Sequence, residues 1–498
     1  MRVRRAPINL VAPRATAADS RSGAARPRGR RPTVTRSAPV AALIACASAA
    51  LSLPLAALAD PPEAEPAREA PVRDLAALTK AAERSYPGLR AASARIRAAQ
   101  AQLDEAWVSP FFQSTITAGV SIAPEVSGSP IFSPDPQLPI DNPWQPIVGF
   151  QIEGVIPLWT FGKLPAARDA ARAGIRAAEA DRTRVLAELR HHVRRAYFAL
   201  QLALDLRQML DEGIPPMRAA AARIDEQIAE GDPEADVMDR WRVQAALAEI
   251  EARSSDVQRL EDTARGALRI LTGVGEVRIP ECPIEPVAVE LQPLERYTGG
   301  AREDRPEVRM LEAAVRARQA SLDFTEAGFF PDIALAYRFG TTWAPGITDQ
   351  TNPFVIDQAN YTSVAAGLVL RWSLDLWGNA YRVDREGALL ADLRERSEEA
   401  GRGIAIEVTE AYRAVEAARR QVDTWGRGHR ETRAWFIAAA QGRDVGTVEM
   451  RDLVDAVRAY FTARYSHLQA IHDLNVALAN LERTSGSPVT QRWEPPCE

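Results

Sequence analysis

The sequence repeats its own plan once, and this repeat constrains the fold more than any other feature. Residues of the first half recur in the same order in the second, at an offset of 213 to 216 positions. The matches are Gly162 with Gly378, Tyr197 with Tyr412, Gly231 with Gly446, and Leu271-Thr272-Gly273 with Thr484-Ser485-Gly486. The identity is weak but the order is kept, which predicts a tandem duplication. We place the first repeat at 60–275, a Pro- and Glu-rich connector at 276–302, and the second repeat with a C-terminal tail at 303–498.

Each repeat is predicted to run helix, strand, loop, strand, long helix, long helix. Alternating apolar and polar residues predict strands at about 112–123 and 147–158, and again at about 332–340 and 363–374. Each alternation lasts about ten residues, the length of a tilted strand that crosses a membrane. A half-buried strand of a soluble sheet has the same local pattern, so the strands alone leave both possibilities open.

The helical segments are too long for a globular domain. Residues from about 160 to 212 contain almost no helix breaker after Pro165 and would extend roughly 75 to 80 Å at ~1.5 Å per residue. Other apolar residues recur at alternating spacings of three and four, as in a coiled coil. They are Ile404, Val408, Ala411, Val415, Ala418, Val422 and Trp425, and later Ile471, Leu474, Leu478 and Leu481. A solvated coiled-coil stalk is the alternative for these segments.

The first 59 residues have the features of a secretory signal peptide. Residues 2–36 contain ten Arg and one Asp, an uncharged apolar run follows at 37–59, and Ala57-Leu58-Ala59 matches an A-x-A cleavage site. A transmembrane anchor and a lipoprotein start at Cys46 are the alternatives. Cleavage after Ala59 leaves 51 basic and 65 acidic residues, and thus a net charge of −14.

The composition of the mature chain excludes several classes of protein. An acidic chain without a basic face is not expected to bind nucleic acid. No nucleophile, metal cluster or phosphate-binding loop has usable spacing, so we expect neither an enzyme nor a cofactor. The five His, including His191-His192, lack the spacing of metal ligands. After Ala59 no apolar stretch reaches the ~18 residues of a membrane helix, so only the strands remain for entry into a membrane.

Four strands per chain cannot close a barrel, and an unpaired strand edge is not tolerated in lipid. Strands of several copies must therefore share one barrel if they span a membrane. Two copies give eight strands with a filled interior, whereas three give twelve strands around a lumen. A membrane location thus predicts a homotrimer, with the loops 124–146 and 341–362 on the outer side and the helices in the periplasm.

Four segments resemble signature segments of the TolC-like outer-membrane efflux proteins, the outer-membrane factors. They are Pro157-Leu158-Trp159-Thr160-Phe161-Gly162, Asp304-Arg305-Pro306-Glu307-Val308, Phe329-Phe330-Pro331-Asp332-Ile333 and residues 445–456, VGTVEMRDLVDA. In the family these are a strand-to-helix junction, the opening of the second repeat, a strand entry and a periplasmic tip. Each segment alone is weak evidence for the family, but all four occur in the family's order. The resemblance covers essentially all of the mature chain.

The resemblance implies an α+β membrane protein with an internal tandem duplication. Long antiparallel coiled-coil helices form a periplasmic α-barrel, and four strands per chain contribute to a trimeric twelve-stranded transmembrane β-barrel. The implied function is the outer-membrane channel of a tripartite efflux or type I secretion system, which conducts substrates passively to the exterior. The implied partners are a periplasmic adaptor, an inner-membrane pump of the RND, ABC or MFS type, and outer-membrane lipid. The alternative is a periplasmic coiled-coil adaptor or scaffold without a barrel.

The resemblance also implies a pore aperture at the periplasmic tip. The family narrows its entrance with carboxylates on the tip helix, which correspond to Asp452 and Asp455. Three copies of each near a threefold axis would concentrate negative potential and favour cations. Two such Asp are also typical of a solvated first turn of a helix, where the helix dipole stabilises them.

The tips themselves are the expected contact sites for the adaptor. The resemblance places Gly231, Gly446 and Thr447 there. Two residues depart from the family pattern. Val448 stands where some relatives have Arg, so the ion pair that an Arg could form at the aperture is in doubt. Pro233 is expected to change the conformation of the turn at the first tip.

Two strand-to-helix junctions are expected at the membrane surface. In each, aromatic residues suit an interfacial girdle and a Gly permits the bend. The junction residues are Pro157, Trp159, Phe161 and Gly162 in the first repeat and Trp372, Trp377 and Gly378 in the second.

Two cysteines, Cys282 and Cys497, remain after cleavage of the leader. An exported chain with two thiols permits one disulfide, and both lie beside Pro shortly after the end of a repeat. The distance between them cannot be read from the sequence, so their pairing is left as a possibility.

Overall fold

The computed structural model describes residues 71–111, 113–125, 141–231, 236–347, 349, 354, 357, 359–490 and 492–493. These residues belong to one compact unit, Glu69–Glu498. The predicted leader with Cys46, Cys497, Pro233 and parts of both predicted outer loops lie outside the described residues.

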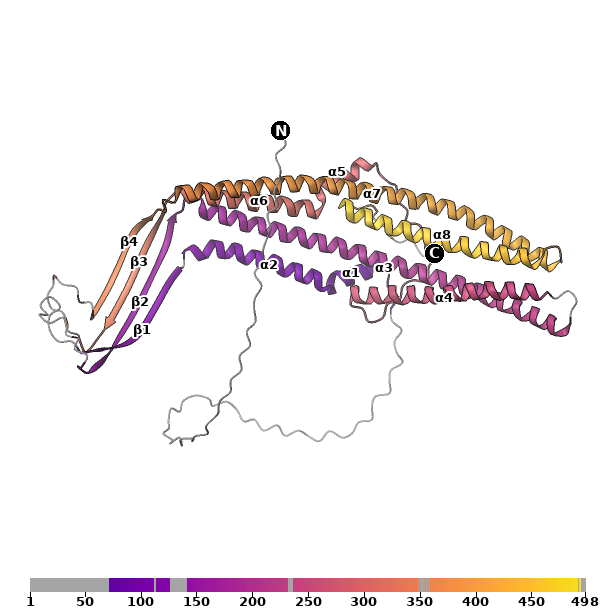
Figure 1. The fold of residues 1–498 in the computed structure, drawn as a ribbon, viewed down its shortest axis with the longest axis horizontal. Helices are drawn as coiled ribbons and strands as arrows, with labels where there is room; N and C mark the ends of the chain where they lie inside the picture. The colour runs from indigo at the N-terminus through magenta and orange to yellow at the C-terminus, as the bar shows by residue number, and fades with distance from the viewer. Residues whose placement is uncertain are drawn as a thin grey trace, which may run out of the picture. The chain divides into compact units, whose positions relative to one another are not determined.

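One order of elements occurs twice along the described chain (Figure 1). The first half contains α1 (Leu75–Ser85), α2 (Pro87–Val108), the 3₁₀ turn η1 (Ser109–Phe111), β1 (Gln113–Pro124), β2 (Trp144–Trp159), α3 (Lys163–Glu230) and α4 (Val237–Thr272). The second contains α5 (Leu294–Asp304), α6 (Pro306–Glu326), η2 (Ala327–Phe329), β3 (Asp332–Trp343), β4 (Tyr361–Arg371), α7 (Leu376–Asp444) and α8 (Met450–Ser485). The four strands lie within three residues of the bounds expected from the sequence.

Each half opens with two helices where we expected one. The break falls before a proline in both cases, at Tyr86-Pro87 and at Arg305-Pro306. Both residues that precede the prolines are extended, with ψ of 119° and 130°. The proline ring disfavours helical ψ in the residue before it, yet suits the first position of the next helix, so each proline ends one helix and starts another.

The long helix α3 extends well past residue 212, where the breaker-free run of the sequence ends. It contains 68 residues, including Pro215 and Pro216, and would measure roughly 100 Å at ~1.5 Å per residue. Two interior prolines remove two helical hydrogen bonds, which ordinarily ends a helix. Here α3 is held from outside, because it packs along both α4 and α8. Just before the prolines, Gly213 leaves room for the ring of Phe461 on α8, which a Cβ would strike.

The strands form one antiparallel sheet in the order β1-β2-β3-β4. The register builds rows of apolar residues across all four strands, one of which runs Ile116, Ile152, Phe339, Val364. The neighbouring row runs Thr115, Glu153, Arg338, Ala365. Because successive side chains point to opposite faces, the sheet has one apolar and one more polar face, which confirms the predicted alternation.

The apolar face of the sheet is exposed in the single chain. Ile116, Val120, Val364 and Leu368 are 63%, 74%, 77% and 73% exposed. Within the described sheet, β1 and β4 each also have one edge without a strand partner. An exposed apolar face with two open edges requires further partners, because both features otherwise favour aggregation.

One side chain crosses a neighbouring strand on the apolar face. Gly154 on β2 lies between Ser114 on β1 and Tyr337 on β3. The Tyr337 ring passes over Gly154, so that a Cβ there would strike it, and its hydroxyl forms a hydrogen bond with Ser114 Oγ. This contact therefore joins β1 and β3 across β2.

The coiled-coil pattern predicted from the sequence marks the core between α7 and α8, which lie side by side (Figure 1). Ile404, Val408, Ala411, Val415, Ala418 and Val422 are all buried, as are Ile471, Leu474, Leu478 and Leu481. Trp425 departs from the pattern and is 40% exposed. No helix within the described ranges is long and apolar enough to span a bilayer.

The connector is fixed to two of the long helices by buried polar groups. Asn475 of α8, which is fully buried, accepts a hydrogen bond from Val287 N at 2.9 Å and donates one to Glu285 O at 2.9 Å. Asp205 of α3 accepts a hydrogen bond from Ile284 N at 2.7 Å. Burial raises the pKa of Asp205, while the hydrogen bond from Ile284 acts to lower it. The connector thereby bridges the two halves.

Candidate functional site

The two helical hairpins end in turns that contain the expected glycines. Gly231 caps α3 with φ of 73°, and Gly446 follows α7 with φ of 76°, a region that side chains disfavour. Thr447 closes the second turn, because its N and Oγ1 both contact the Gly442 carbonyl, at 2.8 and 3.0 Å. Residues 232–235 of the first turn lie outside the described residues.

The two predicted aperture carboxylates lie next to the second turn. Asp452 is in the first turn of α8 and Asp455 follows within the same helix, and both side chains are exposed. Across the described residues, no basic side chain forms an ion pair with either. Both carboxylates therefore face solvent in the single chain, near the N-terminus of α8.

The first strand-to-helix junction turns sharply over a few residues. Pro157 lies where the register between β2 and β3 shifts, a bulge that tolerates its missing N–H. Phe161 and Gly162 then both have positive φ, 47° and 102°, before α3 begins. Phe161 is held in this strained conformation by stacking on Phe330, with ring centroids 5.5 Å apart, and by an edge contact with Trp159.

An ion pair fixes the same junction to the second half of the chain. Lys163, the first residue of α3, lies 2.8 Å from Asp332 at the start of β3, and its Nζ also donates to Phe330 O at 3.3 Å. The side chain of Lys163 is 20% exposed and that of Asp332 is 37% exposed. This pair therefore orients the start of β3 against the start of α3.

The second junction differs from the first in the position of its glycine. Gly378 lies inside the first turn of α7 and does not have positive φ. The helix begins instead at Asp375, whose carboxylate caps it by accepting the Gly378 N–H at 3.1 Å. Trp372 Nε1 donates to Phe329 O at 3.0 Å, whereas Trp377 is 81% exposed.

Four residues of these junctions were not expected from the sequence: Asp375, Phe330, Lys163 and Asp332. Asp375 stands directly before a helical pattern, so the preference for Asp at the N-cap was a usable signal. Phe330 and the pair Lys163–Asp332 had no such signal, because their contacts join segments about 170 residues apart.

The more polar face of the sheet contains a cross-strand network. Arg338 donates to Gln151 Oε1 at 2.9 Å, and Gln151 Nε2 donates to Glu153 at 2.9 Å. Gln113, Thr115, Ala336 and Gly367 line a hollow on this face beside the network. The charged side chains thus gather on the face opposite to the exposed apolar rows.

The histidines do not form a metal site in the part of the chain that the structure describes, where no group of three His, Cys, Asp or Glu is placed for a metal. His429 of α7 and His467 of α8 lie together, with ring centroids 5.7 Å apart. Burial lowers the pKa of both rings, and nearby guanidinium groups, Arg430 among them, lower it further. Both rings are therefore neutral at pH 7 and pack between the helices.

Cys282 of the connector is disulfide-bonded. The other two cysteines of the chain, Cys46 and Cys497, lie outside the described residues.

The chain matches one family model, described as outer membrane efflux protein, over residues 78–274 and 299–487. These segments cover more than half of the chain and correspond to its two halves. No curated protein matches the sequence.

The fold is similar to solved structures of outer-membrane channels. The channel OprN has a TM-score of 0.68 and 21% identity over 84% of this chain and 91% of its own. The open state of MtrE from Neisseria gonorrhoeae has a TM-score of 0.66 and 19% identity, with 84% and 91% covered. VceC from Vibrio cholerae has a TM-score of 0.65 and 16% identity, with 84% and 97% covered. At these identities the similarity shows a shared fold.

Proposed function

The chain belongs to the outer membrane efflux protein family, and from this premise we propose that it is the outer-membrane channel of a tripartite export system. Three copies form one continuous duct. A periplasmic adaptor and an inner-membrane pump deliver substrates to its entrance, and the substrates pass through it without further energy input. The duct catalyses no reaction.

The observation that carries this proposal is the incomplete sheet. Its free edges are β1, with 12 residues, and β4, with 11 residues, so the edge of one copy matches the edge of the next in length. Three copies supply twelve strands, which close a barrel and leave no edge in lipid. The exposed apolar rows then face lipid, and the network around Arg338 faces the lumen. Trp159, Trp372 and Trp377 lie at the membrane boundary.

The long helices extend the duct into the periplasm in this proposal. The tandem duplication supplies two hairpins per chain, α3 with α4 and α7 with α8, so a trimer has six around one passage. The turns at Gly231 and at Gly446 with Thr447 contact the adaptor. Asp452 and Asp455 of the three copies surround the aperture.

The proposal is tested by fractionation, heat-modifiable electrophoresis and planar-bilayer recordings of the purified full chain. We expect outer-membrane localisation, a trimer whose migration changes on heating, and discrete conductance steps. A periplasmic coiled-coil adaptor or scaffold without a barrel would show none of the three. Soluble periplasmic protein without conductance would therefore contradict the proposal.

We further propose that Cys282 pairs with Cys497. Cys46 is removed with the leader if cleavage follows Ala59, which leaves Cys497 as the partner. Trp493 packs on α3, with its ring 6.5 Å from Phe198 and 3.9 Å from the Arg194 guanidinium. The connector is also held on α3, where Ile284 donates to Asp205, and the four residues from Trp493 to Cys497 can span roughly 13 Å.

Peptide mass mapping of the non-reduced mature protein is expected to yield a linked Cys282–Cys497 peptide pair and an N-terminus at Asp60. The bond closes a loop of more than two hundred residues, so Cys497→Ser is expected to lower the free energy of unfolding by about 2–4 kcal/mol. A free thiol at Cys282 in the native protein would contradict the pairing, and a lipidated Cys46 would contradict the cleavage site.

A further inference from the structure

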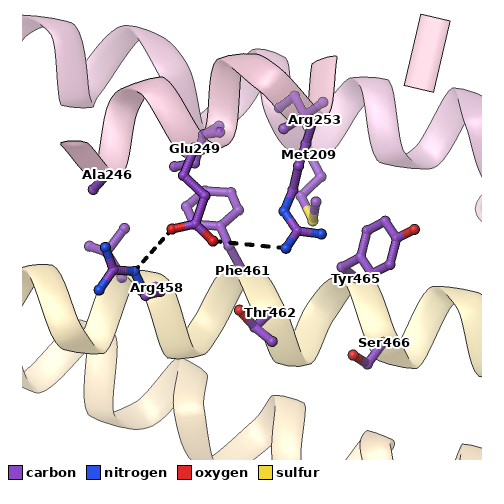
Figure 2. A pocket seen from close by; sticks show the side chains of 12 residues that line it. Met209, Ala246, Glu249, Arg253, Arg458, Phe461, Thr462, Tyr465 and Ser466 are labelled. Atoms are coloured by element: carbon purple, nitrogen blue, oxygen red, sulfur yellow. Dashed lines mark ion pairs between the residues drawn. The ribbon is translucent and has the colours of Figure 1, made fainter. Parts of the chain in front are cut away.

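A cavity of about 240 Å³ lies between α3, α4 and α8, and the proposed channel function does not use it (Figure 2). Its floor is apolar and is built from Met209, Leu210, Ala246, Ile250 and Phe461. The first four of these side chains are at least 90% buried. An apolar floor of this size accommodates a compact hydrophobic body, such as one or two fused rings.

The rim of the cavity is charged and carries an excess of positive charge. Glu249 of α4 lies between two guanidinium groups, 3.2 Å from Arg458 Nε on α8 and 3.8 Å from Arg253 Nη2 on its own helix (Figure 2). Within the described residues neither Arg forms an ion pair with any other carboxylate. One negative and two positive side chains leave a net charge of +1 at the rim.

Arg253 is the less firmly held of the two guanidinium groups. Its distance to Glu249 is near the limit for an ion pair, and its other neighbour is the ring of Tyr465, whose centroid lies 5.5 Å away. Thr462 and Ser466 on α8 place hydroxyl groups along the same wall (Figure 2). Arg253 can therefore move to a ligand carboxylate without breaking a strong contact. The hydroxyls of Thr462 and Ser466 can then donate hydrogen bonds to the same carboxylate.

We propose that this cavity binds a small amphipathic organic anion, a flat apolar body that bears one carboxylate. The apolar body occupies the floor between Ala246 and Phe461, and the carboxylate pairs with Arg253. A ligand in this position contacts α4 of the first half and α8 of the second at once. Occupancy therefore stabilises the present arrangement of the two helical hairpins.

The probe is 2-naphthoate, compared with the neutral 2-acetylnaphthalene, in calorimetric titrations of the full-length protein in lipid nanodiscs. We expect saturable binding of 2-naphthoate that is about tenfold tighter than that of the neutral analogue. Arg253→Gln is expected to remove this preference while leaving the neutral analogue unaffected. Ala246→Leu fills the floor and is expected to abolish binding of both.

Two matched controls on α4 keep the test specific. Arg259 and Ala248 are exposed and do not line the cavity, so Arg259→Gln and Ala248→Leu are expected to bind like the wild type. Arg253 is half exposed in the folded chain, so its replacement does not threaten folding. Absence of saturable binding, equal affinity for both probes, or full binding to a folded Ala246→Leu variant would overturn the proposal. None of these results depends on whether the protein conducts ions.

Discussion

Replacing Asp452 and Asp455 together with Ala is expected to raise single-channel conductance and to weaken block by a multivalent cation by at least about tenfold. Six carboxylates surround the aperture of the proposed trimer, and in the single chain neither residue has an ion-pair partner among the described residues. A multivalent cation gains from all six at once, so their removal affects block more strongly than it affects conduction by monovalent ions.

Planar-bilayer recordings with and without a trivalent cation on the periplasmic side measure both effects. Asp423→Ala is the matched control, because Asp423 is an exposed carboxylate in the middle of α7, away from the tip. Unchanged conductance and block in the double variant, beside a normal control, would show that the constriction lies elsewhere.

Gly154→Val is expected to prevent assembly of the barrel in most molecules. The new side chain would strike the Tyr337 ring and approach Gln113 O, to which even a Cβ would lie at 2.9 Å. Overpacking of this kind costs about 1–3 kcal/mol per site, and a trimer contains the site three times. The yield of heat-modifiable trimer in the outer membrane measures the effect.

A second substitution separates this clash from a general intolerance of Val in strands. Tyr337→Ala removes the ring but leaves the approach to Gln113 O, so the double variant is expected to recover part of the trimer. Gly149→Val is the control on the same strand, because the nearest atom to a Cβ there is Thr342 Oγ1 at an ordinary contact distance of 3.8 Å. Equal loss in the control, or no recovery in the double variant, would contradict the role of the Tyr337 contact.

Much of this architecture could be predicted from periodicity. The alternation of Ile116, Val120 and their neighbours predicted both strand positions and faces, because a half-exposed strand repeats every two residues. The seam from Ile404 to Val422 predicted the buried side of α7, because helix pairing imposes spacings of three and four. Both signals are local and therefore readable in one sequence.

The features that sequence reasoning missed depend on distant contacts. Pro215 and Pro216 predict the end of a helix in the sequence. In the structure α3 continues past both prolines, because its packing against α4 and α8 stabilises the helical conformation there. Gly378 matched Gly162 by position, yet it lies inside α7, whose first turn is capped by Asp375. The crossing of Gly154 by Tyr337 follows only from strand register, which no local pattern determines.

The connector joins two of the long helices, α3 and α8, through hydrogen bonds. Asp205 and Asn475 fasten α3 and α8 to the same short segment, so the two helices are joined there as well as by their direct packing. Between Asp205 and its tip, α3 contains Pro215 and Pro216, which remove hydrogen bonds that an unbroken helix would have. A movement that separates α3 from α8 must therefore break the hydrogen bonds that Asp205 and Asn475 form with the connector.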